Sequence, residues 1–66
     1  MNFAERLKYL RKKHKFTQKY VAKMLNCDKS TISKYESGKI NPSLKNAIKI
    51  CQIFGVKLDY LAGLVD

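Results

Sequence analysis

The segment Thr17–Asn41, TQKYVAKMLNCDKSTISKYESGKIN, contains the pattern from which the fold follows. Its apolar residues predict one helix over residues 18–25 and a second over residues 29–37. Asn26 lies at the corner between them, and asparagine tolerates the left-handed conformation that a tight corner requires. The segment therefore predicts a helix–turn–helix, with slight strain at Asn26 because glycine would be the easier residue there.

Both helices of this segment carry start signals. Thr17 and Asp28 stand at N-cap positions, where a side-chain oxygen accepts a hydrogen bond from a free amide of the first turn. The residue before each cap faces an apolar residue at the fourth helical position, which fixes the angle at which the chain enters the helix. The two pairs are Phe16 with Val21 and Cys27 with Ile32.

The second helix has two different faces. Ile32, Tyr35 and the neighbouring Glu36 are expected to pack inward. The other face forms a continuous polar stripe of hydroxylated and cationic side chains: Lys29, Ser30, Ser33, Lys34 and Ser37. Short hydrogen-bonding groups edged by lysines suit the floor of a DNA groove, and they also suit plain solvent. Other features of the sequence are needed to distinguish these two interpretations.

Composition favours a nucleic-acid partner. The chain has 66 residues and a net charge of +9, and residues 1–39 hold eleven of its 14 lysines and arginines but only three of its 5 acids. A one-sided basic excess is typical of proteins that bind a polyanion. The length predicts a single domain over residues 1–66 without a deep cleft. With no paired carboxylates, activated nucleophile or glycine-rich phosphate loop, the sequence argues against an enzyme.

The cysteines and the single histidine do not form a metal-binding pattern. Cys27 and Cys51 each lie in an apolar context and His14 lies in a basic run, without CxxC or HxxxH spacing. We therefore expect no metal and no cofactor. A disulfide between the cysteines stays open, although reduced, buried thiols are favoured. The chain shows no signal peptide and no membrane-length apolar run, so we expect a cytoplasmic protein.

The parts of the chain around this segment are also helical. Asn2 and Glu5 have the spacing of a capping box at the start of a first helix. The apolar face of this helix consists of Phe3, Ala4, Leu7 and Leu10. Arg11 lies at the edge of that face, so we expect its guanidinium to be partly buried.

Towards the C-terminus, Gly38 ends the second helix of the motif and Ile40 is expected to anchor the connector in the core. A fourth helix begins after a cap at either Asn41 or Ser43. Its apolar face is wide enough to imply burial on two sides or a partner, and it consists of Leu44, Ala47, Ile48, Ile50, Cys51, Ile53 and Phe54. A short final helix is expected over residues 58–62. The prediction is a compact all-α domain of five helices, in which the first, fourth and fifth hold the helix–turn–helix.

Taken together, these residues resemble the phage-repressor-like (Xre/Cro-type) helix–turn–helix proteins. The residues that carry the resemblance are Thr17-Gln18, Ala22, Ile32-Ser33-Lys34-Tyr35-Glu36, Gly38, Asn41-Pro42-Ser43, Gly55-Val56 and Leu58-Asp59-Tyr60-Leu61. The resemblance implies a lambda-repressor-like DNA-binding domain that acts as a transcriptional regulator, with a repressor favoured. It further implies a homodimer that binds a palindromic operator of double-stranded DNA, with the second helix of the motif in the major groove.

The resemblance also assigns roles to individual positions. Base contacts fall on Lys29, Ser30, Ser33 and Lys34, and phosphate contacts fall on Thr17, Gln18, Ser37 and Lys39. Arg11 and Glu36 match a pair that bridges two helices in relatives. The chain departs from the family pattern at Asn26, where glycine is usual. It also departs at Lys29 and Lys34, where many relatives have glutamine or arginine, and lysine is a flexible point charge that contacts either guanine or phosphate.

Two further expectations concern partners. Because the sequence shows no separate dimerisation domain, the dimer is expected to use an apolar surface near the C-terminus, formed by Leu58, Leu61, Leu64 and Val65. The alternative function is an antitoxin-like or adaptor module that works mainly through a protein partner. The two hypotheses differ in whether the polar stripe or the apolar C-terminal surface is needed.

Overall fold

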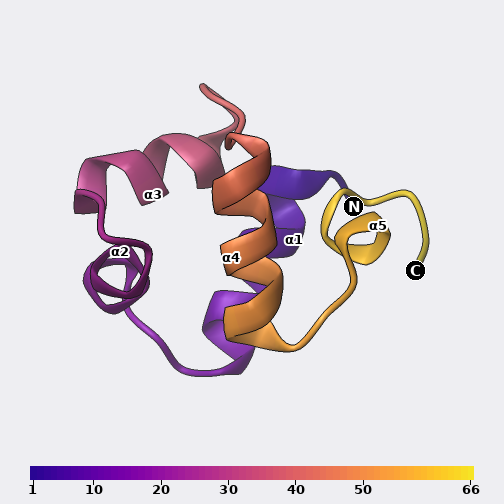
Figure 1. Ribbon diagram of the computed structural model, residues 1–66, viewed down its shortest axis with the longest axis horizontal. Coiled ribbons are helices and arrows are strands. Elements are labelled where there is room, and N and C mark those ends of the chain that lie inside the picture. The colour runs from indigo at the N-terminus through magenta and orange to yellow at the C-terminus, as the bar shows by residue number, and fades with distance from the viewer.

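The computed structural model describes residues 1–66 and contains five helices without a strand (Figure 1). The helices are α1 (Phe3–Lys13), α2 (Gln18–Leu25), α3 (Lys29–Ser37), α4 (Leu44–Phe54) and α5 (Leu58–Leu61). The predicted all-α class and the predicted bounds of the helix–turn–helix are confirmed. None of the five helices has the length and hydrophobicity that crossing a membrane requires.

Every helix contributes a side chain to one core. The largest fully buried side chains are Leu7, Val21, Ile32, Ile50 and Leu61, one from each helix in turn. Helix α3 packs against α2 and α1, while α4 packs against α2 and α5 (Figure 1). Figure 1 also shows both chain termini beside α5. The motif formed by α2 and α3 is therefore held directly by α1 and α4, whereas α5, which was also expected to hold it, packs against α4 and α1.

Local hydrogen bonds define three of the helix starts. The Asn2 and Glu5 side chains exchange hydrogen bonds with each other's backbone N–H at 2.9 and 3.2 Å, which confirms the capping box. Thr17 Oγ1 accepts from the N–H of Tyr20 at 3.0 Å. Ser43 Oγ accepts from the N–H of Asn46 at 3.2 Å. The hydroxyl of Ser43, rather than the side chain of Asn41, therefore caps α4.

The cap expected at Asp28 is only half realised. Asp28 occupies the N-cap position of α3 with extended backbone, but its carboxylate accepts no hydrogen bond from the first turn. The residue is exposed, so water competes for the carboxylate. What remains is the attraction between its charge and the positive end of the α3 dipole.

Ile40 does not anchor the connector, so that expectation is wrong. The N–H groups of Lys39 and Ile40 both donate to the carbonyl of Lys34. These bonds fold the chain back around the C-terminal end of α3 and keep Ile40 at the surface, where it is exposed.

The wide apolar face of α4 is buried on one side only. Ala47, Ile50 and Phe54 enter the core, whereas Leu44 and Ile48 remain exposed. The exposed fraction of Leu44 reaches 67%. Of the two explanations for the wide face, burial within this chain is thus excluded for Leu44 and Ile48.

Arg6 is a buried cation that the sequence did not reveal. Its guanidinium carbon lies 4.0 Å from the centre of the Tyr60 ring, and Nη2 donates to the carbonyl of Val65 at 3.3 Å. Nearby, a side chain on Gly63 would meet the carbonyl oxygen of Met1, because a Cβ built there lies 2.0 Å from it. Arg6 and Gly63 therefore hold the C-terminal segment against the start of α1.

Lys15 adopts a left-handed conformation with a φ of 59°. It follows α1 in a Schellman motif, since Phe16 N–H donates to Arg11 C=O and Lys15 N–H donates to Lys12 C=O. A residue with a Cβ is strained in this region, and glycine is not.

We expect Lys15→Gly to raise the free energy of unfolding by about 1 kcal/mol, because it removes this backbone strain. The matched control is Lys8→Gly inside α1, which should lower it by about 1 kcal/mol. Urea unfolding followed by circular dichroism measures both. Equal destabilisation of the two variants would contradict a strained Lys15.

Candidate nucleic-acid interface

Helix α3 exposes the whole polar stripe that the sequence predicted. Lys29, Ser30, Ser33, Lys34 and Ser37 are all exposed. On the opposite face Ile32 and Tyr35 are buried. The Tyr35 hydroxyl accepts a hydrogen bond from Asn46 of α4 at 3.1 Å, and the Tyr35 ring meets Phe3 edge-on at 5.9 Å. Packing thus fixes which face of α3 points outward.

A bidentate ion pair joins α1 to α3. Arg11 Nε donates to Glu36 Oε2 at 2.6 Å, and Arg11 Nη2 donates to Glu36 Oε1 at 3.0 Å. The Arg11 and Glu36 side chains are only 11% and 5% exposed. Two parallel charge-assisted hydrogen bonds in a shielded site set both distance and orientation. The rotation of α1 about its axis is therefore tied to that of α3.

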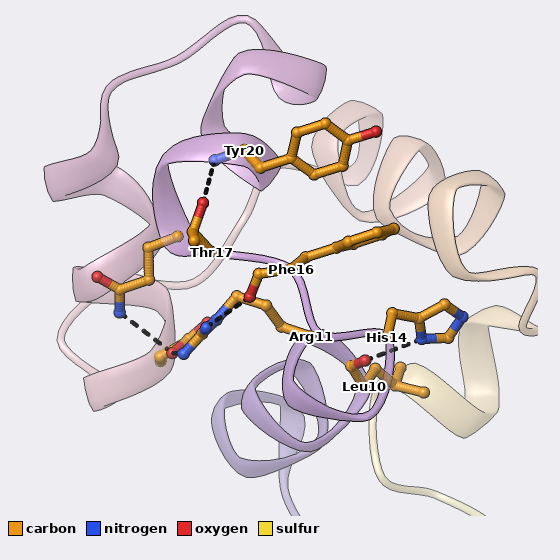
Figure 2. Close-up of polar contacts among 8 residues, drawn as sticks. Leu10, Arg11, His14, Phe16, Thr17 and Tyr20 are labelled. Carbon is orange, nitrogen blue, oxygen red and sulfur yellow. Dashed lines mark hydrogen bonds and ion pairs between the residues drawn. The ribbon is translucent and has the colours of Figure 1, made fainter.

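The Arg11–Glu36 pair also makes hydrogen bonds with residues at the start of α2. Arg11 Nη1 donates to the carbonyl of Phe16 at 2.9 Å, and Gln18 Nε2 donates to Glu36 Oε1 at 3.2 Å. Figure 2 shows Arg11 reaching from α1 to Phe16, with Thr17 capping at Tyr20 just beyond. Glu36 thus accepts hydrogen bonds from two helices, and its charge is compensated where the three helices meet.

The residues assigned to phosphate contact lie in different settings. Gln18 and Ser37 line one hollow, whereas Thr17 and Lys39 lie outside it. The hydroxyl of Ser37 donates to the carbonyl of Lys34 at 3.2 Å, and Thr17 Oγ1 already accepts from Tyr20. Lys39 is exposed. Of the four, only Lys39 carries a cationic side chain that is free to reach an anion.

The hollow has a volume of about 290 Å³ and no hydrophobic lining. It is lined by Lys8, Arg11, Lys12, Gln18, Ser33, Glu36 and Ser37. Sequence reasoning missed Lys8 and Lys12, which lie four residues apart on one face of α1 and line the hollow beside Arg11. The helical spacing of these two lysines about Arg11 was the signal that could have found them, once Arg11 was paired with Glu36.

The surface expected to form a dimer interface needs one correction. Leu61 is 1% exposed and belongs to the core, so a partner cannot reach it. Leu58, Leu64 and Val65 are exposed. Leu58 also lines a largely apolar groove of about 190 Å³, together with Phe3, Asn41, Pro42, Ala47, Leu61 and Ala62. The helical spacing of Leu58 and Leu61 could not show that Leu61 is fully buried while Leu58 stays exposed at the edge of this groove.

The two cysteines are free thiols in half-buried positions. Burial raises the pKa of the Cys27 thiol, and the Asp28 carboxylate raises it further. Burial and the Asp59 carboxylate act in the same way on the pKa of Cys51. Both thiols are therefore protonated and weakly nucleophilic at neutral pH.

The single histidine makes packing contacts. The Nδ1 atom of His14 lies 2.9 Å from the Leu10 carbonyl oxygen, and its ring meets the Phe54 ring edge-on at 5.1 Å.

An exposed polar helix on a helix–turn–helix frame defines a class of DNA-binding regulators. The Helix-turn-helix family model matches residues 7–61. The chain belongs to the phage-repressor-like (Xre/Cro-type) family of helix–turn–helix transcriptional regulators. It is 48% identical over 54 residues to an uncharacterised HTH-type transcriptional regulator of Methanocaldococcus jannaschii, covering 82% of each chain.

Other relatives are longer. The chain is 35% identical over 63 residues to the HTH-type transcriptional regulator ImmR of Bacillus subtilis and spans 50% of that protein. Among solved structures, the P22 c2 repressor in complex with a synthetic operator matches with a TM-score of 0.87 at 28% identity, covering 92% of each chain. The restriction-modification controller protein C.AhdI of Aeromonas hydrophila matches with a TM-score of 0.81 at 29% identity, covering 89% of each chain.

We expect Arg11→Met to lower the free energy of unfolding by roughly 3–5 kcal/mol, because it leaves the carboxylate of Glu36 buried without its partner. Urea unfolding measures the change. The double variant Arg11→Met/Glu36→Leu removes both charges and should be more stable than Arg11→Met alone. If the double variant is destabilised by the sum of the effects of Arg11→Met and Glu36→Leu measured separately, the two side chains are not energetically coupled and the prediction fails.

Proposed function

We propose that this protein is a sequence-specific transcriptional regulator, acting as a repressor, that binds a palindromic operator of double-stranded DNA as a homodimer. The observation that carries the proposal is the exposed polar stripe of α3, whose orientation is fixed by the Arg11–Glu36 ion pair. The match to the operator-bound P22 c2 repressor supports the same interpretation. The protein would act in the cytoplasm, without a cofactor or catalysis.

In the proposed complex α3 lies in the major groove, which admits one α-helix. The side chains offered to base edges are Lys29, Ser30, Ser33 and Lys34. Phosphates on either side are met by Thr17 and Gln18 at the start of α2 and by Ser37 and Lys39 after α3. Free N–H groups of the first turn of α2 add partial positive charge there. Phosphate contacts set position and affinity, and base contacts set sequence preference.

A homodimer follows from the small size of one reading helix. Helix α3 has 9 residues, so one copy contacts few base pairs. Two copies spaced by about one helical turn of DNA double the number of base contacts. The apolar residues left exposed on α4, α5 and the C-terminal segment supply surface for such pairing, and they are Leu44, Ile48, Leu58, Leu64 and Val65. An operator occupied in this way blocks access to the promoter.

The same apolar residues support the second candidate function, an antitoxin-like or adaptor module that binds another protein. The groove at Pro42, Ala47 and Leu58 is a specific feature in its favour. The two functions separate experimentally, because only the first requires the stripe of α3.

We expect selection from a random duplex library to return a palindromic site that the protein binds at least about 10³-fold more tightly than scrambled DNA. Lys34→Ala should weaken binding to that site by roughly 5- to 150-fold, since a base contact is worth about 1–3 kcal/mol. Fluorescence anisotropy measures both affinities. Lys45→Ala on α4 is the matched control for removal of one charge. Weak, sequence-blind binding that moderate salt abolishes would overturn the regulator proposal.

For the dimer, we expect the double variant Leu44→Ser/Leu58→Ser to raise the dissociation constant of the homodimer by at least about tenfold, because two apolar side chains are no longer buried between the copies. Sedimentation velocity measures the change. The substitutions are uncharged, so binding to a single half-site should persist. Met24→Ser on α2 is the control, as Met24 is an exposed apolar residue outside this surface. Unchanged dimerisation would place the interface elsewhere.

A further inference from the structure

The polar hollow between α1 and α3 contains cationic residues that have not been given a role in DNA binding above. Lys8 and Lys12 line it from α1, and Ser33 and Ser37 line it from α3. Ser33 belongs to the exposed stripe of α3, so the hollow opens beside the surface proposed to face DNA. Its polar lining and volume of about 290 Å³ suit a hydrated anion rather than an apolar side chain.

The Arg11–Glu36 pair determines where the two lysines lie. Lys8 and Lys12 lie four residues apart and so share one face of α1, and Lys8 lies one turn before Arg11. Because Arg11 is held by two hydrogen bonds to Glu36, α1 cannot turn to carry Lys8 and Lys12 elsewhere. Lys13 points differently, with its Nζ 5.9 Å from the centre of the Tyr9 ring. Lys13 does not line the hollow.

The electrostatics of the hollow are set by what is already paired. The Glu36 carboxylate accepts hydrogen bonds from Arg11 and Gln18 and is nearly inaccessible to solvent, so it offers little repulsion to an incoming anion. The ion pair of Arg11 with Glu36 is the only one in the structure, so Lys8 and Lys12 are uncompensated. The hollow thus has two unpaired ammonium groups beside a carboxylate whose charge is already compensated by Arg11. This arrangement favours the binding of a singly charged phosphodiester.

We propose that this hollow receives a backbone phosphate of the bound duplex and that Lys8 and Lys12 of α1 are its ligands, with the Ser33 hydroxyl nearby. The inference rests on the proposed DNA-binding function and adds α1 to the elements that grip the phosphate backbone. It also gives the Arg11–Glu36 pair a second role, since the pair both aims α1 and keeps the carboxylate of Glu36 from repelling the phosphate.

Phosphate binding has a signature that base recognition lacks. Each neutralised phosphate releases a counterion, so the slope of log K against log salt concentration falls by about 0.9 for every phosphate that a variant no longer neutralises. A phosphate carries no sequence information, so the affinity falls by the same factor on the selected operator and on scrambled duplex. Lys34→Ala, by contrast, is proposed to act mainly on the selected operator.

The test measures how the Lys8→Gln, Lys12→Gln and double variants of this chain bind the selected operator and scrambled duplex at several salt concentrations. We expect the double variant to lower the slope by about 0.9 for each phosphate that loses both of its ligands, and each single variant to lower it by a smaller amount. Lys13→Gln is the matched control, because it removes the same charge from the neighbouring position on the same helix. Its slope should stay within about 0.3 of the unmodified protein's. Lys12→Arg, which keeps the charge, should restore the slope.

The alternative outcomes are distinct. If Lys13→Gln lowers the slope as much as Lys12→Gln does, the lysines act through the general field of the protein and the phosphate site is refuted. The site is also refuted if the double variant keeps the full slope while the unmodified protein still prefers the operator, a result that leaves the proposed function intact. If the unmodified protein shows no preference for any duplex, the proposed function fails together with the site. Circular dichroism verifies that each variant is folded.

Discussion

The bidentate contact between Arg11 and Glu36 holds the working surface of this protein in place. It connects α1 to α3 across a shielded site and takes in the carbonyl of Phe16 and the side chain of Gln18. A single exposed ion pair contributes little to stability, but a shielded, doubly hydrogen-bonded pair resists any rearrangement that would separate its charges. The pair therefore restrains the motif at the junction of three helices. Its contribution is to geometry more than to net stability.

All five helices contribute to the hydrophobic core around that junction. One fully buried aliphatic side chain comes from each helix, so no helix can leave without exposing part of a common core. A domain of 66 residues buries a modest share of its surface, and small contributions matter accordingly. The capping bonds at Asn2, Thr17 and Ser43 are contributions of this kind. The contacts of Arg6 with Tyr60 and Val65 add another where the two ends of the chain meet.

The two surfaces of interest come from different parts of the chain. The cationic and hydroxylated side chains that face the proposed DNA site belong to α1, α2 and α3, where the excess of bases lies. The large apolar side chains left exposed beyond α3 belong to the connector, α4, α5 and the C-terminal segment. This division allows a protein partner or a second copy to cover one surface without neutralising the other.

Features that depend on near neighbours could be predicted from the amino-acid sequence alone. The caps at Asn2 and Thr17 and the left-handed turn at Asn26 involve groups within about four residues of each other, so spacing and residue type were enough. Spacing and residue type also oriented α3, because a helix fixes which residues share a face. Long-range packing settled the rest. Leu58 and Leu61 look alike in the sequence, and only the packing of α1 and α4 against α5 buries the second and exposes the first. In the same way, Arg6 became a buried residue and Lys8 and Lys12 came to line a hollow, because the helix that covers or faces each of them lies far away in the chain.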